Sequence, residues 1–181
     1  MNIVKSVTNQ EESEMYIRYS RESDKESIER LFTACFGDSR HYPDAFENLQ
    51  GRYLLAFTSD NTLIAMSGLY WSEDYQAYEI DWSCTAPENR GDGVMHELFK
   101  RLCSLTDEPI YCSCWRLEHH EHPNLYDLMK DFGFKEVINC RVTWVNGHNC
   151  HCDKLECVSK NLEGTCECYE DLYLRKGGHR A

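Results

Sequence analysis

Three segments of the chain place apolar residues at the three- and four-residue intervals of an amphipathic helix. The first follows the capping-box spacing of Ser23–Glu26. The second runs from about Gly93 to Leu105, and the third follows His122 and ends at Gly133, a residue type that commonly terminates helices. The patterns therefore predict three helices, each with one buried face. Their apolar positions are Ile28, Leu31, Phe32, Cys35 and Phe36; Val94, Met95, Leu98, Phe99, Leu102 and Leu105; and Leu125, Leu128, Met129 and Phe132.

Between these segments, short runs rich in β-branched and aromatic residues predict strands. The run YLLAFTSDNTLIAMSGLYW, residues 53–71, divides around Asp60 and Asn61, residue types that tolerate a tight turn, so an antiparallel hairpin is expected. The other predicted strands are YIRYS at 16–20, AYEIDWSCT at 77–85, PIYCSCWRL at 109–117, VINCRVTWV at 137–145 and CYEDLYLRK at 168–176.

The order of these elements predicts a mixed α/β fold in one domain. A chain of 181 residues can bury a sizeable core, and no internal repeat or clear boundary divides it. Residues 1–15 are polar and unpatterned, so we expect a flexible leader before a single domain at 16–181. A cysteine-rich insertion at about 146–168 separates the last two predicted strands.

The charge balance bears on the choice of partner. Lys and Arg number 19 against 31 Asp and Glu, a formal net charge of −12, which disfavours nucleic acid and suits an amine or another cationic substrate. No apolar run is long enough to span a bilayer, and the N-terminal residues lack a signal-peptide core. We therefore expect a cytoplasmic protein without a membrane partner.

The stretch CTAPENRGDGVMHELFKRL, residues 84–102, joins a predicted strand to a predicted helix through a glycine-rich turn. Such a turn aims unpaired backbone N–H groups at one point, where the helix dipole adds positive potential, and so predicts an anion cradle. The stretch is neither a P-loop, since no Gly-Lys-Ser/Thr follows, nor a full dinucleotide fingerprint, because residue 96 is His. The alternative is that Gly91 and Gly93 only shape a tight turn.

The residues APENRGDGVMHELFKRL resemble the acyl-CoA-binding signature of the GNAT acyltransferases, Pro-x-x-Arg-Gly-x-Gly-x-Gly followed by an amphipathic helix. The matching residues are Pro87, Arg90, Gly91, Gly93 and Leu98. A second stretch, LYDLMKDFGFKEV, is similar to the late helix and strand of that family, with Gly133 and Phe134 as its Gly-Phe pair. The resemblance covers most of the chain, from about Tyr16 to Val145.

The resemblance implies a central, mixed, twisted sheet of about six to seven strands flanked by helices, and acetyl-CoA as cosubstrate. It implies that Ser83, Cys84 and Thr85 pair with the pantetheine arm, and that Arg90, Gly91, Asp92, Gly93, Val94 and Met95 hold the pyrophosphate. The family's asparagine near the start of the late helix is replaced by His122, which leaves Asn124, two positions on, as a further cofactor-binding candidate. Met95 stands where the family has a small residue, so it either narrows the cradle or points into the core.

The implied reaction moves an acetyl group to a primary amine by direct attack in a ternary complex. An amine is mostly protonated at neutral pH and needs a base before it can attack. Glu79 falls where histone acetyltransferases of the family carry a glutamate base, and Asp81 shares its side of the strand, since side chains alternate. A raised pKa is expected for such a carboxylate beside an apolar cleft. The alternative is that it only binds the ammonium group or faces solvent.

Protonation of the leaving thiolate is less clearly assigned. Many relatives use a tyrosine four residues before the Gly-Phe pair, a position that Met129 occupies here. Tyr126, one turn earlier, is the substitute candidate and is equally well an ordinary surface tyrosine. A thiolate can also leave unaided.

Three histidines and one cysteine are further candidates. His119, His120 and His122 are second-line candidates for acid, base or acceptor contact. Cys84 lies close enough to the expected thioester for a covalent route to be considered.

Eleven cysteines is an odd number, which rules out complete internal disulfide pairing. Cys150, Cys152, Cys166 and Cys168 form two Cys-x-Cys pairs around Cys157 and are the candidate ligands of a structural zinc. Reduced thiols packed in a hairpin and disulfides are the alternatives.

Two functions follow from these observations. The first is an acetyl-CoA-dependent N-acetyltransferase acting on a small-molecule or peptide amine. The second is a catalytically degenerate module of the same fold that binds CoA or a partner, with the insertion as interaction surface. We expect a monomer or homodimer.

Overall fold

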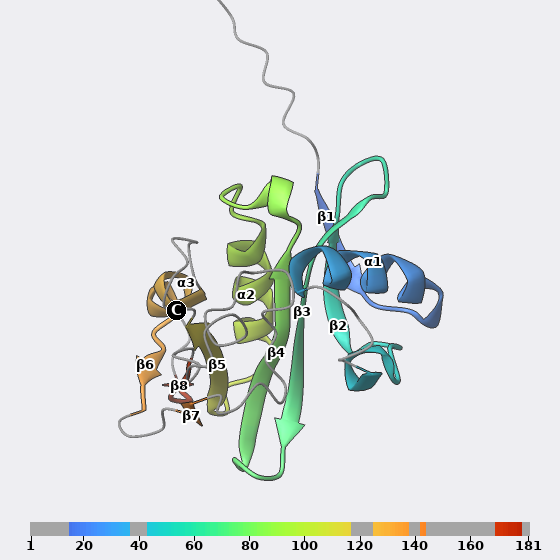
Figure 1. Ribbon diagram of the computed structural model, residues 1–181. Coiled ribbons are helices and arrows are strands. Elements are labelled where there is room, and N and C mark those ends of the chain that lie inside the picture. The colour runs from blue at the N-terminus through green and yellow to red at the C-terminus, as the bar shows by residue number, and fades with distance from the viewer. Residues whose placement is uncertain (1–14, 37–42, 117–124, 138–141, 144–168, 179–181) are drawn as a thin grey trace, which may run out of the picture.

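The computed structural model describes residues 15–36, 43–116, 125–137, 142–143 and 169–178. Figure 1 shows the arrangement of the helices and strands in this part of the chain. The helices are α1 (Lys25–Phe36), α2 (Val94–Ser104) and α3 (Leu125–Asp131), with short 3-10 turns at η1 (Glu22–Asp24), η3 (Pro43–Phe46) and η4 (Pro87–Asn89). The strands are β1 (Tyr16–Tyr19), β2 (Tyr53–Phe57), β3 (Leu63–Ser72), β4 (Ala77–Thr85), β5 (Ile110–Arg116), β6 (Lys135–Glu136), β7 (Val142–Thr143) and β8 (Tyr169–Arg175).

All the described strands belong to one sheet in the order β1-β2-β3-β4-β5-β8-β6, and β7 also pairs with β8. Every pair is antiparallel except β4 with β5, so the sheet is mixed, as predicted. Its main path has seven strands, within the predicted six to seven, and β7 adds a short strand beside β8. Among the described residues, the stretch predicted as one strand, 137–145, contains β7, and β6 lies just before that stretch.

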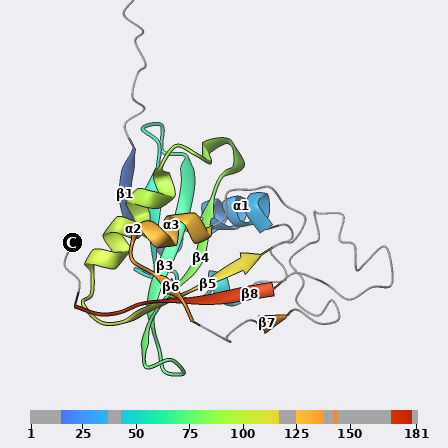
Figure 2. The ribbon, with the colours of Figure 1, turned by 90° about the vertical axis from the view of Figure 1, so that its left-hand side faces the viewer.

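Helices cover both faces of the sheet (Figure 2). In β2, Leu54 and Ala56 pack into the core under α2 and α3, whereas Tyr53, Leu55 and Phe57 pack into a second core under α1. The alternation follows from the two-residue period of a strand whose two faces are both buried. The molecule therefore has three layers: α1, the sheet, and α2 with α3.

The start of α1 differs from the sequence prediction. Ser23 lies within η1, and the carboxylate with a capping hydrogen bond is that of Asp24, the last residue of η1. Its Oδ2 accepts a hydrogen bond of 2.8 Å from the backbone N–H of Arg21, the residue before η1, and its two oxygens accept bonds of 2.7 Å from the guanidinium of Arg18 on β1. A tertiary ion pair that local spacing does not reveal thus helps to fix the capping carboxylate of the turn that leads into α1.

Other local predictions are confirmed. The hairpin of β2 and β3 turns at Asp60 and Asn61, and Asn61 has a positive φ of 70°. Gly133 ends α3 with a φ of 78°, and the next residue, Phe134, donates its N–H back to the carbonyl of Met129. The leader, the first residues of the predicted third helix and the insertion at about 146–168 lie outside the described residues. No helix in the described ranges is long and apolar enough to cross a membrane.

Candidate active site

The parallel strands β4 and β5 separate partway along their length. They pair only from Tyr78 to Ile80 on β4, opposite Ile110 to Cys112 on β5. Although both strands are described well beyond these residues, they make no further pairs with each other. The edge of β4 from Asp81 to Thr85 therefore faces an opening in the sheet, where an extended ligand can supply the missing backbone partner.

A β-bulge in β4 lies directly after the point of separation. Met66 of β3 faces Cys84 and Gly68 faces Asp81, so two steps on β3 correspond to three on β4. The extra residue reverses the usual alternation of side chains from here to the end of the strand. Trp82, at the bulge, has a φ of 52°, an unusual conformation for a bulky residue. Its ring lies 5.3 Å from that of Phe32 on α1, a contact that can stabilise this conformation.

The bulge gathers residues on the α1 face of the sheet. Tyr78 and Ile80 pack on the α2 side, so Glu79 and Asp81 face the α1 side. Cys84, three residues after Asp81, would point to the α2 side in a regular strand but is buried in the α1-side core. By this alternation both candidate carboxylates share one face, and the buried thiol of Cys84 shares it with them.

Tyrosines surround the two carboxylates. Tyr70 of β3 lies opposite Glu79, and Tyr111 of β5 is paired beside it. Burial raises the pKa of Tyr70, and the charges of Asp81 and Glu79, together with a hydrogen bond to Glu79, raise it further. Burial likewise raises the pKa of Tyr53, which also senses Asp81. Both tyrosines therefore stay protonated at neutral pH. The hydroxyl of Tyr53 donates to the carbonyl of Ala45 at 2.8 Å, so Tyr70 is the one of the two that can donate to a carboxylate.

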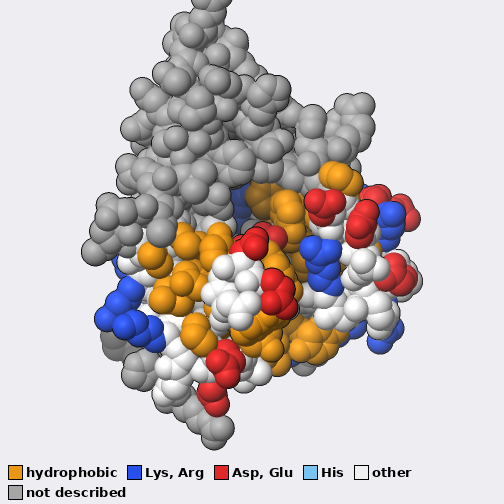
Figure 3. Space-filling view, turned by 90° about the horizontal axis from the view of Figure 1, so that it is seen from below, with side chains coloured by type: hydrophobic (Ala, Val, Ile, Leu, Met, Phe, Trp, Pro, Cys, Tyr) orange, Lys and Arg blue, Asp and Glu red, His pale blue; other side chains and the backbone are white. Residues whose placement is uncertain are grey.

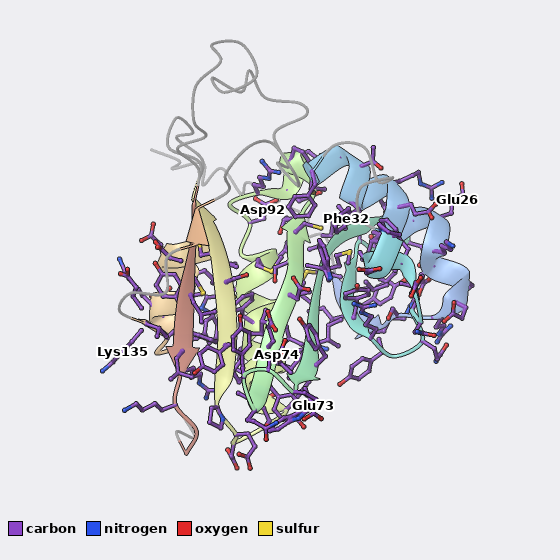
Figure 4. All side chains as sticks on the ribbon, turned by 60° about the horizontal axis from the view of Figure 1, so that its bottom comes forward. Glu26, Phe32, Glu73, Asp74, Asp92 and Lys135 are labelled. Carbon is purple, nitrogen blue, oxygen red and sulfur yellow. The ribbon has the colours of Figure 1, made fainter. Side chains whose placement is uncertain are left out.

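The same end of the sheet exposes aromatic surface. Tyr75, in the turn between β3 and β4, contacts Tyr111 with tilted rings whose centroids are 4.9 Å apart, and Tyr70 is partly buried, with 37% of its surface exposed. Seen from below, Figure 3 shows hydrophobic side chains gathered with acidic ones at this end of the molecule. Figure 4 places Glu73 and Asp74 at the hairpin turn, far from Asp92 at the start of α2. The surface combines the aromatic and anionic groups that suit a cationic ligand.

The glycine-rich turn leads from η4 into α2. Gly91 and Gly93 have φ values of 92° and 77°, and Gly93 is the residue that precedes the first turn of α2. The first intrahelical hydrogen bond runs from the N–H of Glu97 to the carbonyl of Gly93, so the preceding N–H groups have no partner within the helix. Their positive φ explains why glycine occupies both positions. Close packing does not explain it, because a Cβ at either position would meet nothing within 4 Å.

Two methionines among the candidate positions lie in or against the core under α2. Met95 is half-buried and packs against the core under α2, which confirms the core interpretation over a narrowed cradle. Met129 is 0% exposed in the same core and has no proton to donate. Tyr126 lies in α3, but its side chain is outside the described part of the structure, as are Asn124, the three histidines His119, His120 and His122, and the proposed zinc ligands Cys150, Cys152, Cys166 and Cys168.

Arg90 and two thiols complete the site at the end of β4. Arg90 donates from Nε to the carbonyl of Thr85 at 3.3 Å, and Cys35 of α1 places its Sγ 3.2 Å from the same oxygen. Burial raises the pKa of Cys84 well above that of a free thiol, so little thiolate is present to attack a thioester at neutral pH. A covalent route through Cys84 is therefore disfavoured.

Sequence reasoning missed four residues of this site: Cys35, Tyr70, Trp82 and Tyr111. Each is an ordinary member of an apolar helix face or strand in the sequence. Strand pairing brings Tyr70 and Tyr111 beside Glu79, helix packing brings Cys35 to the end of β4, and the bulge sets the position of Trp82. None belongs to a local motif that could have identified it.

No model of a protein family matches this sequence, and no curated protein matches it significantly. Many solved structures do. The ribosomal-protein-S18-alanine N-acetyltransferase of Escherichia coli aligns with a TM-score of 0.63 at 9% identity, over 93% of this chain and 97% of that one. An aminoglycoside 6'-N-acetyltransferase complexed with coenzyme A gives 0.57 at 12% identity, over 92% and 99%. A longer Pyrococcus horikoshii chain assigned as an acetyltransferase gives 0.54 at 19% identity, over 74% of this chain and only 47% of that one.

These proteins share with this chain an arrangement and not a sequence. The structural alignments show that the chain has the GNAT acyltransferase fold.

Proposed function

We propose that the protein is an acetyl-CoA-dependent N-acetyltransferase that moves the acetyl group to a primary amine by direct attack in a ternary complex. The observation that carries the proposal is the opening between β4 and β5, which has an unpaired strand edge on one side and the start of α2 at its end. An extended pantetheine arm with a pyrophosphate at its far end has the shape and charge for such a site.

The cradle residues fit acetyl-CoA in their chemistry. The backbone N–H groups of residues 91–95 would hold the pyrophosphate, and the open space at Gly91 and Gly93 leaves room for it. Asp81 to Thr85 would pair with the pantetheine arm, which would bring the thioester to the point where the strands separate. In this arrangement the bulge at Trp82 lies beside the reacting carbonyl.

The chemistry begins with the amine. Glu79, assisted by Asp81, would take the proton of the bound ammonium group, directly or through water, so that the nitrogen lone pair can attack the thioester carbonyl. Backbone N–H groups on the edge of β4 beside the thioester would stabilise the tetrahedral oxyanion. The CoA thiolate then leaves without an obligatory acid, because the pKa of a thiol near 8.5 makes the thiolate a tolerable leaving group.

The acceptor surface would select for positive charge. Glu79 and Asp81 lie among Tyr70, Tyr75 and Tyr111 at one end of the sheet, so a protonated amine would find carboxylates and aromatic faces together. Small amines and peptide N-termini both satisfy this requirement. We place the reaction in the cytoplasm, with a monomer or homodimer as the active species and without nucleic acid or membrane as partner.

Calorimetric titration with acetyl-CoA is the first test. Micromolar binding is expected, with a large loss for acetyl-pantetheine, which has the thioester but no pyrophosphate. Release of CoA thiol is then followed with a panel of polyamines, aminoglycosides and peptide amines. Absence of acetyl-CoA binding in folded protein contradicts the proposal.

A second function is favoured by one observation. Met129 is buried where many proteins of this fold carry a tyrosine donor, which fits a degenerate module that binds CoA or a partner without turnover. Acetyl-CoA binding without transfer to any amine of the panel would support this alternative, whereas turnover with any one of them excludes it.

A further inference from the structure

Two thiols from distant parts of the sequence meet beside the end of β4. Cys35 lies in the last turn of α1, and Cys84 is the penultimate residue of β4. Cys35 Sγ is 3.2 Å from the carbonyl oxygen of Thr85, the residue that follows Cys84, and the two thiols lie close enough to shift each other's pKa. Both belong to the core under α1, where Cys35 packs from the margin and Cys84 is 6% exposed.

The two thiols differ in reactivity. The Cys84 thiol lowers the pKa of Cys35 by hydrogen-bonding to it, and Arg90 lowers it further, against the opposing effect of burial. Burial and the neighbouring Cys35 raise the pKa of Cys84. Cys35 is also the half-exposed member of the pair. A more acidic, accessible thiol in contact with a buried one is the arrangement of an attacking and a resolving cysteine.

We propose that Cys35 and Cys84 form a site of reversible oxidative modification, at which hydroperoxides convert the two thiols into a disulfide that ties α1 to β4. The Cys35 thiolate attacks the peroxide and breaks the O–O bond, which gives a sulfenic acid at Cys35 and hydroxide that is protonated to water. The sulfur of Cys84 then attacks that of Cys35; the S–S bond forms, the S–O bond breaks, and the hydroxyl leaves as water with the Cys84 proton. Two electrons pass to the peroxide, and a dithiol reductant returns them.

A disulfide between Cys35 and Cys84 would change the site at the end of β4. A disulfide would tether the end of α1 to the part of β4 that borders the opening between β4 and β5. It would also remove the ionisable thiol of Cys35, whose pKa Arg90 helps to lower, and put a covalent link in its place. The inference stands on the thiol pair alone and does not depend on acetyl transfer.

Peptide mapping tests the proposal directly. Trypsin releases Cys35 in residues 31–40 and Cys84 in residues 53–90, and each of these peptides contains one cysteine. Purified full-length protein is reduced, exposed to stoichiometric hydrogen peroxide, alkylated in denaturant and digested without reductant. The expected result is a cross-linked pair of these peptides that disappears after dithiothreitol. A rise in Tm on the order of 5 °C is expected in the oxidised protein.

Matched controls separate this site from general oxidation. Peptide 102–116 contains Cys103, Cys112 and Cys114, all buried, and burial raises the pKa of Cys103 to about 11. These three cysteines should remain reduced and should be recovered in alkylated form. Cys84→Ser should instead accumulate a dimedone-reactive sulfenic acid at Cys35, whereas Cys35→Ser should show neither product. Recovery of Cys84 as a free thiol in oxidised, folded protein would overturn the proposal, as would Cys35 linked only to a cysteine at 140–168.

Discussion

Tyr70 on β3 lies directly opposite Glu79 on β4, close enough for its hydroxyl to interact with the carboxylate. The tyrosine is held in its protonated form by burial and by the two nearby carboxylates, so at neutral pH it acts toward Glu79 as a donor. A donor to a carboxylate favours the ionised form of that carboxylate. Tyr70 therefore has the role of a positioning residue for the proposed base.

Removal of this donor should be visible in the pH dependence of the reaction. Without the Tyr70 hydroxyl the ionised form of Glu79 loses a hydrogen bond, so the pKa of Glu79 rises and the acid limb of the kcat/KM profile shifts to higher pH in Tyr70→Phe. Tyr78→Phe is the matched control, because Tyr78 is the neighbour of Glu79 on the other face of the sheet. A profile unchanged in Tyr70→Phe would remove Tyr70 from the mechanism.

The two carboxylates should contribute to turnover and not to acetyl-CoA binding. Glu79→Gln and Asp81→Asn are each expected to lower kcat/KM by about 100-fold, the scale of a lost general base, while calorimetric affinity for acetyl-CoA changes little. Glu73→Gln, at the exposed hairpin turn, should leave both quantities unchanged. If neither carboxylate variant loses activity, a base outside the described residues must act instead.

The cradle can be tested with two glycines of similar conformation. Gly93 and Gly51 both have a φ above 70°, and a Cβ at either would meet nothing within 4 Å. Each substitution by alanine should therefore cost about 1 kcal/mol of stability through backbone strain. Only Gly93→Ala should weaken acetyl-CoA binding, by about 10-fold or more, because only Gly93 begins α2. Equal affinities in the two variants would argue against an anion site at this turn.

Asp24 should stabilise the fold in a pH-dependent way. The hydrogen bonds from Arg18 lower the pKa of Asp24 below its unfolded value, so its stabilising contribution is present above about pH 4 and is lost as the pH falls through the folded pKa. Asp24→Asn is expected to cost about 2 kcal/mol in urea unfolding at pH 7 and progressively less below pH 4. The control is Asp127→Asn, whose carboxylate is exposed and 3.5 Å from Lys130, and which should cost about 0.5 kcal/mol or less. A cost for Asp24→Asn that stays constant down to pH 3 would contradict this assignment.

The sequence predicted most of the described elements, because their causes are local. Apolar spacing placed α1 and α2 within about a residue of their observed ends, and the glycine turn before Val94 was recognised from its composition. The strand at Ala77–Thr85 was predicted with the observed bounds. The fold class and the position of the candidate cradle thus follow from patterns within about twenty residues.

Tertiary structure decided how these elements make a site. The bulge at Trp82, the separation of β4 from β5 and the pairing of Tyr70 with Glu79 all depend on which strands become neighbours and in which register. The cap at Asp24 and the thiol pair of Cys35 and Cys84 likewise join segments that the chain brings together only on folding. Local periodicity determines what a segment becomes and which face it buries, whereas pairing between distant segments determines which side chains meet. For this protein the sequence alone determined the elements and the glycine turn, and the sheet decided the surroundings of the carboxylates and thiols.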